Sequence, residues 1–208
     1  MKILLRYKYF GLLIFPLVIL FLSWQESGTR FSHELNSFFP KEHLSKKERV
    51  LYFLGEEEIS NPLSQRQKKD LARAIVRSSQ RLQLPDGTLF SGVNPDVDLF
   101  LFNWAKVRTN FGSVSKANSR YGILGLTETT LKEFEKRNNV QIERKFDALN
   151  YNIQYKISII LYKELLATDL NAKEAYFKLF ELPPNSNEWD ILEKSYLEIH
   201  KKTIPENL

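Results

Sequence analysis

Apolar residues recur at helical spacing along most of the chain after residue 44, and no segment alternates as a strand does. The clearest case begins at Ser64 and runs for about twenty residues, with one apolar face. That face carries Leu71, Ala74, Ile75, Ser78 and Leu82. Similar patterns predict helices over 45–55, 96–108, 127–134, 151–166, 172–180 and 189–201. Because the connections between them are short, we predict an all-α domain.

Polar residues at the expected helix starts supply caps. Ser45 and Glu48 have the spacing of a capping box, in which each side chain binds the other residue's backbone N–H. Thr127 is placed to cap the helix that follows it, and Asp96 or Asp98 is placed to cap the helix that leads to Arg108.

The first 25 residues differ from the rest. A basic start, MKILLRYK, precedes an uncharged apolar run over 9–24. This arrangement predicts a signal anchor or signal peptide over 1–25, with the membrane reached through residues 3–24. A polar linker over 26–44 and a helical domain over 45–208 follow.

The flank of the apolar run sets the expected location. No small-x-small cleavage signature follows the run, which favours an uncleaved anchor over a cleaved signal. Basic residues before the span predict a single-pass inner-membrane protein whose domain faces the periplasm. If the signal is cleaved, we expect secretion to the periplasm.

Composition excludes several classes of function. The chain has no cysteine, so disulfides, thiolate metal sites and cysteine nucleophiles are absent. The three histidines are scattered, and we expect neither a metal nor a cofactor. The net charge is +5, but Lys2, Arg6 and Lys8 supply three of it. The remaining balance is too small to mark a nucleic-acid surface, so we expect no nucleic-acid partner.

A series of short motifs follows the helices in a recognisable order. They are Leu71-Ala72-Arg73-Ala74-Ile75, then Phe111, then Gly122-Ile123-Leu124-Gly125-Leu126, then Asn152-Ile153 with Leu161-Tyr162-Lys163-Glu164-Leu165-Leu166, and finally Ala175-Tyr176. In this order the chain resembles soluble-type lytic transglycosylases of the lysozyme-like superfamily, over roughly residues 63–184. The resemblance implies a lysozyme-like helical fold and peptidoglycan as the ligand.

The sequence departs from the family at its chemistry. The family's glutamate falls on Arg108, or on Thr109 if the alignment slips by one. Glycoside cleavage needs a carboxylic acid that donates a proton to the leaving oxygen, and neither residue provides one. The family's Gln falls on Glu128, and its Asn falls on Phe177. Whether the chain is an enzyme therefore stays open.

Glu128 is the carboxylate that the resemblance places nearest the groove, and it is the one candidate catalytic residue. As a relocated acid it needs a raised pKa. The alternative is a solvated first-turn glutamate, whose pKa the helix dipole would lower.

The candidate substrate-binding residues are Arg108, Thr109, Phe111, Gly122, Gly125 and Tyr176. Arg108 either forks onto a ligand carboxylate or is an exposed helix-end cation. The two glycines either let a glycan approach the backbone or form a tight turn at positive φ. The resemblance implies that Tyr176 points at the catalytic carboxyl, and core packing is its alternative.

Three hypotheses follow. The first is an anchored transglycosylase-like domain that holds a peptidoglycan glycan strand or a cell-wall protein without cutting it. The second is an active, atypical lytic transglycosylase that uses Glu128 or another carboxylate. The third is a helical envelope adaptor unrelated to glycan. The missing glutamate favours the first over the second.

Overall fold

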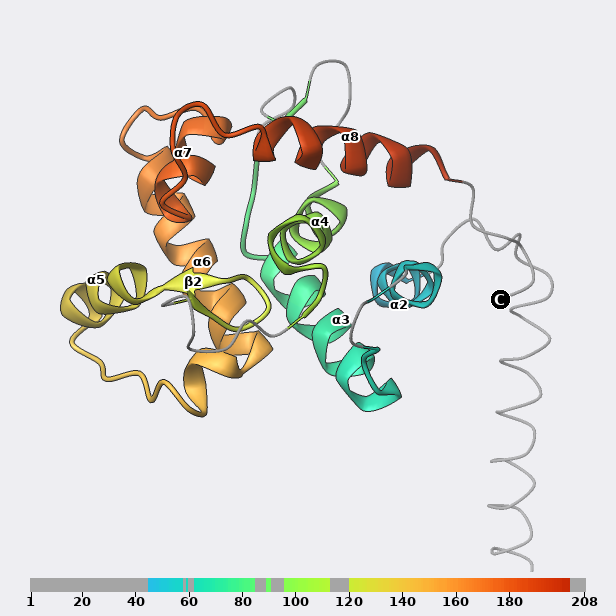
Figure 1. The fold of residues 1–208 in the computed structure, drawn as a ribbon, viewed down its shortest axis with the longest axis horizontal. Helices are drawn as coiled ribbons and strands as arrows, with labels where there is room; N and C mark the ends of the chain where they lie inside the picture. Colours follow the sequence, from blue (N-terminus) through green and yellow to red (C-terminus); the bar gives the residue numbers. More distant parts are fainter. Residues whose placement is uncertain are drawn as a thin grey trace, which may run out of the picture. The chain divides into compact units, whose positions relative to one another are not determined.

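The computed structural model describes residues 45–57, 59, 62–84, 89–90, 96–112 and 120–202. They belong to one compact unit, Ser45–Leu208. The predicted anchor (1–25) and linker (26–44) lie outside the described residues. The described elements are helical apart from one two-stranded hairpin (Figure 1), so the prediction of a mainly helical domain is confirmed.

Seven α-helices account for most of the described chain. They are α2 (Lys46–Glu56), α3 (Gln65–Ser79), α4 (Val97–Thr109), α5 (Glu128–Asn138), α6 (Tyr151–Leu166), α7 (Ala172–Leu179) and α8 (Glu188–Lys201). A short 3-10 helix, η2 (Asp147–Leu149), precedes α6. The strands β1 (Arg120–Tyr121) and β2 (Leu126–Thr127) form an antiparallel pair. Periodicity missed this hairpin because two residues per strand are too few to alternate.

Side-chain caps define where several helices begin. Ser45, Ser64 and Asn171 each form a full capping box at the start of α2, α3 and α7. The Thr127 hydroxyl accepts the Thr130 N–H at the start of α5, as predicted. Each cap satisfies a backbone donor that the first turn leaves unpaired, which typically contributes about 1 kcal/mol.

Helix α4 runs through the middle of the unit. Every residue from Asp98 to Ala105 is buried, which is typical of a helix covered on all sides. It packs against α3 and α8, while α6 packs against α3 and α7. Figure 1 shows α8 along the top of the view above α4, with α5 at the left beside the hairpin.

An aromatic cluster joins the helices around the end of α4. The indole ring of Trp104 lies 5.2 Å from the Tyr162 ring, 5.4 Å from Phe180 and 5.9 Å from Tyr176, between ring centroids. These partners come from α6 and from α7 and its C-cap. Tilted and edge-on contacts of this kind add to the hydrophobic effect of burying the rings. The cluster therefore holds α6 and α7 against α4.

The two aspartates at the start of α4 do not act as the predicted caps. Asp96 is the N-cap residue, but its side chain makes no capping hydrogen bond. Instead Arg49 of α2 donates to both oxygens of Asp96 at 2.7 Å and to Asp98 Oδ2 at 2.6 Å. Asp98 is fully buried, and burial raises its pKa. Burial also opposes ionisation of Asp96, but the hydrogen bonds from Arg49 hold its pKa below the usual value. Both carboxylates therefore bind Arg49 instead of the backbone N–H groups at the start of α4.

Arg49→Met should destabilise the domain by roughly 3–5 kcal/mol, because it removes the hydrogen-bonded cation of the buried Asp98 carboxylate and leaves it the more distant Lys46, at 4.0 Å. Urea unfolding of the full chain measures this loss. Arg66→Met is the matched control, because the Arg66 side chain is 94% exposed and its one ion pair, with Asp70, is long at 4.0 Å. This variant should change the free energy of unfolding by less than about 0.5 kcal/mol. Equal effects of the two variants would contradict the clamp.

Candidate functional site

The last turn of α4 carries Arg108 and Thr109, the two residues onto which the resemblance places a catalytic glutamate. The helix ends when Asn110 and then Phe111 adopt left-handed backbone, with φ of 47° and 58°. A left-handed backbone is unusual for a bulky aromatic residue and stores strain, which is common where structure serves function. The turn directs Phe111 into the core, where it is fully buried and its ring lies 5.0 Å from Phe102. Phe111 is thereby placed among core residues, and Arg108 and Thr109 face the hairpin.

The hairpin turn packs closely against α4 and α6. Gly122 and Gly125 both have positive φ, as the tight-turn interpretation requires. A Cβ on Gly122 would lie 2.2 Å from the side-chain amide of Gln154. Gln154 Oε1 in turn accepts the Leu124 N–H at 3.1 Å. The space in front of Gly122 is therefore filled by a side chain of α6.

Arg108 is buried and paired within the protein. Its side chain is only 3% exposed, so the interpretation as an exposed helix-end cation is wrong. Its Nη1 donates to both carboxylate oxygens of Glu188, at 2.8 and 2.9 Å. Its Nε and Nη2 donate to the carbonyls of Leu124 and Gly125, at 3.3 and 3.4 Å. The guanidinium also stacks 4.7 Å from the ring centroid of Phe180.

Tyr176 completes this arrangement. Its side chain is fully buried, and its hydroxyl donates to Glu188 Oε1 at 2.8 Å. Burial and the neighbouring Glu188 charge raise the pKa of the Tyr176 hydroxyl, so it stays a donor. Glu188, the first residue of α8, thus receives hydrogen bonds from both Arg108 and Tyr176, and its side chain is 19% exposed.

The hydroxyls of threonines near the hairpin are also engaged. Thr109 donates to the Ile123 carbonyl at 2.6 Å, which ties the last turn of α4 to the hairpin turn. Thr127 donates to Glu181 Oε1 at 2.6 Å. Glu181 has a φ of 50°, so a strained backbone holds this carboxylate against the hairpin. Thr109 and Gly125 lie together, because a Cβ on Gly125 would be 3.5 Å from Thr109 Cγ2.

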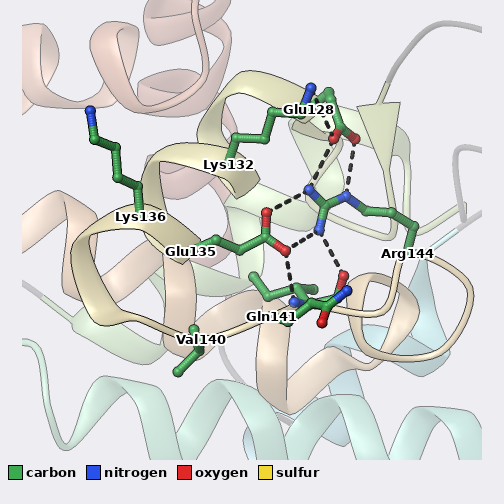
Figure 2. Close-up of a pocket in the computed structure, with 8 residues that line it drawn as sticks. Glu128, Lys132, Glu135, Lys136, Val140, Gln141 and Arg144 are labelled. Atoms are coloured by element: carbon green, nitrogen blue, oxygen red, sulfur yellow. Dashed lines mark hydrogen bonds and ion pairs between the residues drawn. The ribbon is translucent and has the colours of Figure 1, made fainter.

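Glu128 faces a different set of residues. It lines an open pocket of about 640 Å³ between α5 and the segment before η2. Figure 2 shows its carboxylate and that of Glu135 on two sides of the Arg144 guanidinium. Arg144 donates to Glu128 at 2.9 and 3.0 Å and to Glu135 at 2.8 and 2.9 Å. The hydrogen bonds from Arg144 lower the pKa of Glu128, which is the opposite of what a general acid needs.

The structure brings the predicted residues into two groups. Arg108 forms the ion pair with Glu188, and Thr109, Gly125 and Tyr176 lie next to it, whereas Glu128 belongs to the Arg144 network. Phe111 and Gly122 pack against core residues instead. Sequence reasoning missed Glu188, Glu181 and Arg144. Arg108 and Glu188 are 80 positions apart, and no local pattern reports a contact over such a separation. The one available signal is charge: a buried arginine needs an acidic partner.

Within the described residues, no group of three histidine, aspartate or glutamate side chains is arranged to hold a metal ion. No helix among those residues is long and apolar enough to cross a membrane. The predicted membrane segment 3–24 lies outside them.

The Arg144 network should make stability depend on acid pH. Arg144 and the Ile142 N–H hold the pKa of Glu135 at about 2, below the value of roughly 4.3 expected for an unfolded chain. The folded-state pKa is depressed, so this stabilisation is complete well above pH 4.3 and is lost as pH falls towards 2. The loss of stability in Glu135→Gln, measured by urea unfolding, should therefore be largest at pH 7 and roughly halved by pH 3. Exposed Glu143→Gln is the control, and a pH-independent effect of Glu135→Gln would contradict this account.

Comparison with known proteins adds no relative to this description: no protein-family model, no curated protein and no solved structure matches the chain.

Proposed function

We propose that this chain is a transglycosylase-like envelope protein that binds peptidoglycan glycan strands without cleaving them. Residues 3–24 hold it in the inner membrane, and its lysozyme-like domain faces the periplasm. The proposal combines the resemblance in the motifs with the state of the residue that replaces the family's glutamate.

The single observation that carries the non-cleaving part is the buried Arg108–Glu188 pair. At the position where the family has its proton donor, this chain has Arg108, whose side chain is 3% exposed. Arginine keeps its proton in proteins and therefore cannot act as the acid. If the alignment slips by one, the residue is Thr109, whose hydroxyl donates to the Ile123 carbonyl. Neither alignment provides a carboxyl at this place.

Glu188 does not supply the missing acid. The resemblance implies a tyrosine that points at the catalytic carboxyl, and the Tyr176 hydroxyl does meet a carboxylate, that of Glu188. Both oxygens of this carboxylate already accept hydrogen bonds from Arg108. An acid in this role needs a free oxygen that carries a proton towards the sugar. The pair supports an inert site whose charge is balanced internally.

The order of the elements supports the glycan-binding part. Helix α3 carries the Leu71–Ile75 motif, the end of α4 leads to Phe111, and a hairpin holds the Gly122–Gly125 motif. Helices α6 and α7 carry the remaining motifs. The motifs therefore follow the elements in the order that the resemblance gives them, although the hairpin itself was not expected.

The test is incubation of the full chain, in mild detergent, with purified sacculi, followed by sedimentation and by mass spectrometry of the released fragments. We expect the chain to sediment with sacculi and to release no 1,6-anhydro-muropeptides, because no proton donor stands at the Arg108 position. An active lytic transglycosylase on the same sacculi is the positive control for product detection.

Glu128→Gln and exposed Glu198→Gln form the matched pair of variants. Anhydro product that disappears only in Glu128→Gln would show an active enzyme with a relocated acid and would overturn the proposal. Absence of both product and sedimentation would also overturn it, in favour of a cell-wall protein partner or an adaptor unrelated to glycan.

A further inference from the structure

Arg120 of β1 lies beside the Arg108–Glu188 pair and forms no ion pair with the residues that the structure describes. A Cβ on Gly125 would lie 3.6 Å from Arg108 Nη2 and 4.0 Å from Arg120 Cδ, so both arginines border the same glycine. Arg120 is partly exposed. With the residues that the structure describes, its guanidinium forms neither a hydrogen bond nor an ion pair within 4 Å.

The electrostatic surroundings of Arg120 favour an added anion. Partial burial lowers the pKa of Arg120, and the nearby charge of Arg108 lowers it further. The carboxylates of Glu188 and Glu181 act in the opposite direction. They are nevertheless engaged elsewhere, Glu188 with Arg108 and Glu181 with the Thr127 hydroxyl. A partly desolvated cation next to a second cation is relieved by a ligand anion.

The contacts of Arg108 make Arg120, and not Arg108, the candidate for binding a ligand anion. The guanidinium of Arg108 is engaged by Glu188, by two backbone carbonyls and by the Phe180 ring. It therefore has no open face for a ligand carboxylate. Binding such a carboxylate was one of the two roles expected for Arg108 from the sequence. Arg120 has the same planar fork of donors, which matches a carboxylate, and its fork is unoccupied within the described structure.

We propose that Arg120 recognises a carboxylate of the peptidoglycan ligand. This inference rests on the proposed function, and it assigns the specificity of that site to an anion on the glycan or its peptide. Peptidoglycan offers two sources of this chemistry, the stem-peptide carboxylates and the lactyl carboxylate that a stripped glycan exposes. In both cases the guanidinium of Arg120 donates two parallel N–H hydrogen bonds to the carboxylate oxygens.

The test compares the affinity of the full chain and of Arg120→Gln for three preparations of sacculi. The first is native, the second has its stem peptides removed by an amidase, and the third has its carboxylates converted to neutral amides. Arg66→Gln removes the same charge from an exposed position of α3 and is the matched control. Thermal unfolding of each variant checks the fold.

We expect Arg120→Gln to weaken binding to native sacculi about tenfold to hundredfold, as for loss of a charge-assisted hydrogen-bonded pair. Arg66→Gln should bind as the unaltered chain does. The unaltered chain should bind amidated sacculi about tenfold to hundredfold more weakly than native sacculi, and this comparison does not involve the variant. If the effect of Arg120→Gln disappears after amidase treatment, the stem peptide supplies the anion; if the effect becomes larger once the amidase has exposed the lactyl groups, the lactyl carboxylate supplies it.

Two outcomes would overturn the inference and are distinguishable from each other. Equal binding of native and amidated sacculi, with no effect of Arg120→Gln, would remove the role of Arg120 and leave glycan binding intact. Absence of binding by the unaltered chain to any of the three preparations would remove the proposed function and the inference together.

Discussion

The candidate site is organised around one charge, the buried guanidinium of Arg108, which needs an acidic partner. A guanidinium taken out of water is costly unless a carboxylate and further acceptors surround it. Arg108 meets this need with Glu188 and with the carbonyls of Leu124 and Gly125. The pair therefore joins the end of α4, the start of α8 and the hairpin turn at one point. The strained backbone at Phe111 follows α4 directly, and Trp104 at the centre of the aromatic cluster lies in α4 itself.

This constraint links the fold to the proposed activity. In the function that we propose, an ion pair with no proton to donate stands where the resemblance places the proton donor. The Tyr176 hydroxyl still meets a carboxylate, although that carboxylate comes from α8 and is bound by Arg108. The charge of Arg108 is balanced by Glu188, and the ligand anion is therefore assigned by our proposal to the neighbouring Arg120. At a separate pocket, Glu128 and Glu135 are both paired with the same cation, Arg144.

Local patterns predicted the helices well, because each helix reports its own buried face and its own cap. The apolar spacing from Leu71 to Ser78 and the cap at Thr127 are both properties of neighbouring residues. The contacts that define the site are of another kind. Arg108 with Glu188 and Arg49 with Asp96 and Asp98 join residues far apart in the sequence, and charge alone does not say which pairs form. The aspartates were accordingly interpreted as caps, and the two-residue strands were too short to recognise.

The most direct test of the central claim is a double-mutant cycle for Arg108 and Glu188, using urea unfolding of the full chain. Arg108→Gln and Glu188→Gln are each measured alone and together. If the two residues form a buried, mutually dependent pair, their coupling energy should be about 2 kcal/mol or more, and the double variant should be less destabilised than the sum of the single ones. Effects that add within about 0.5 kcal/mol would show that Arg108 is not held by Glu188, and would remove the physical basis for an inert, internally neutralised site.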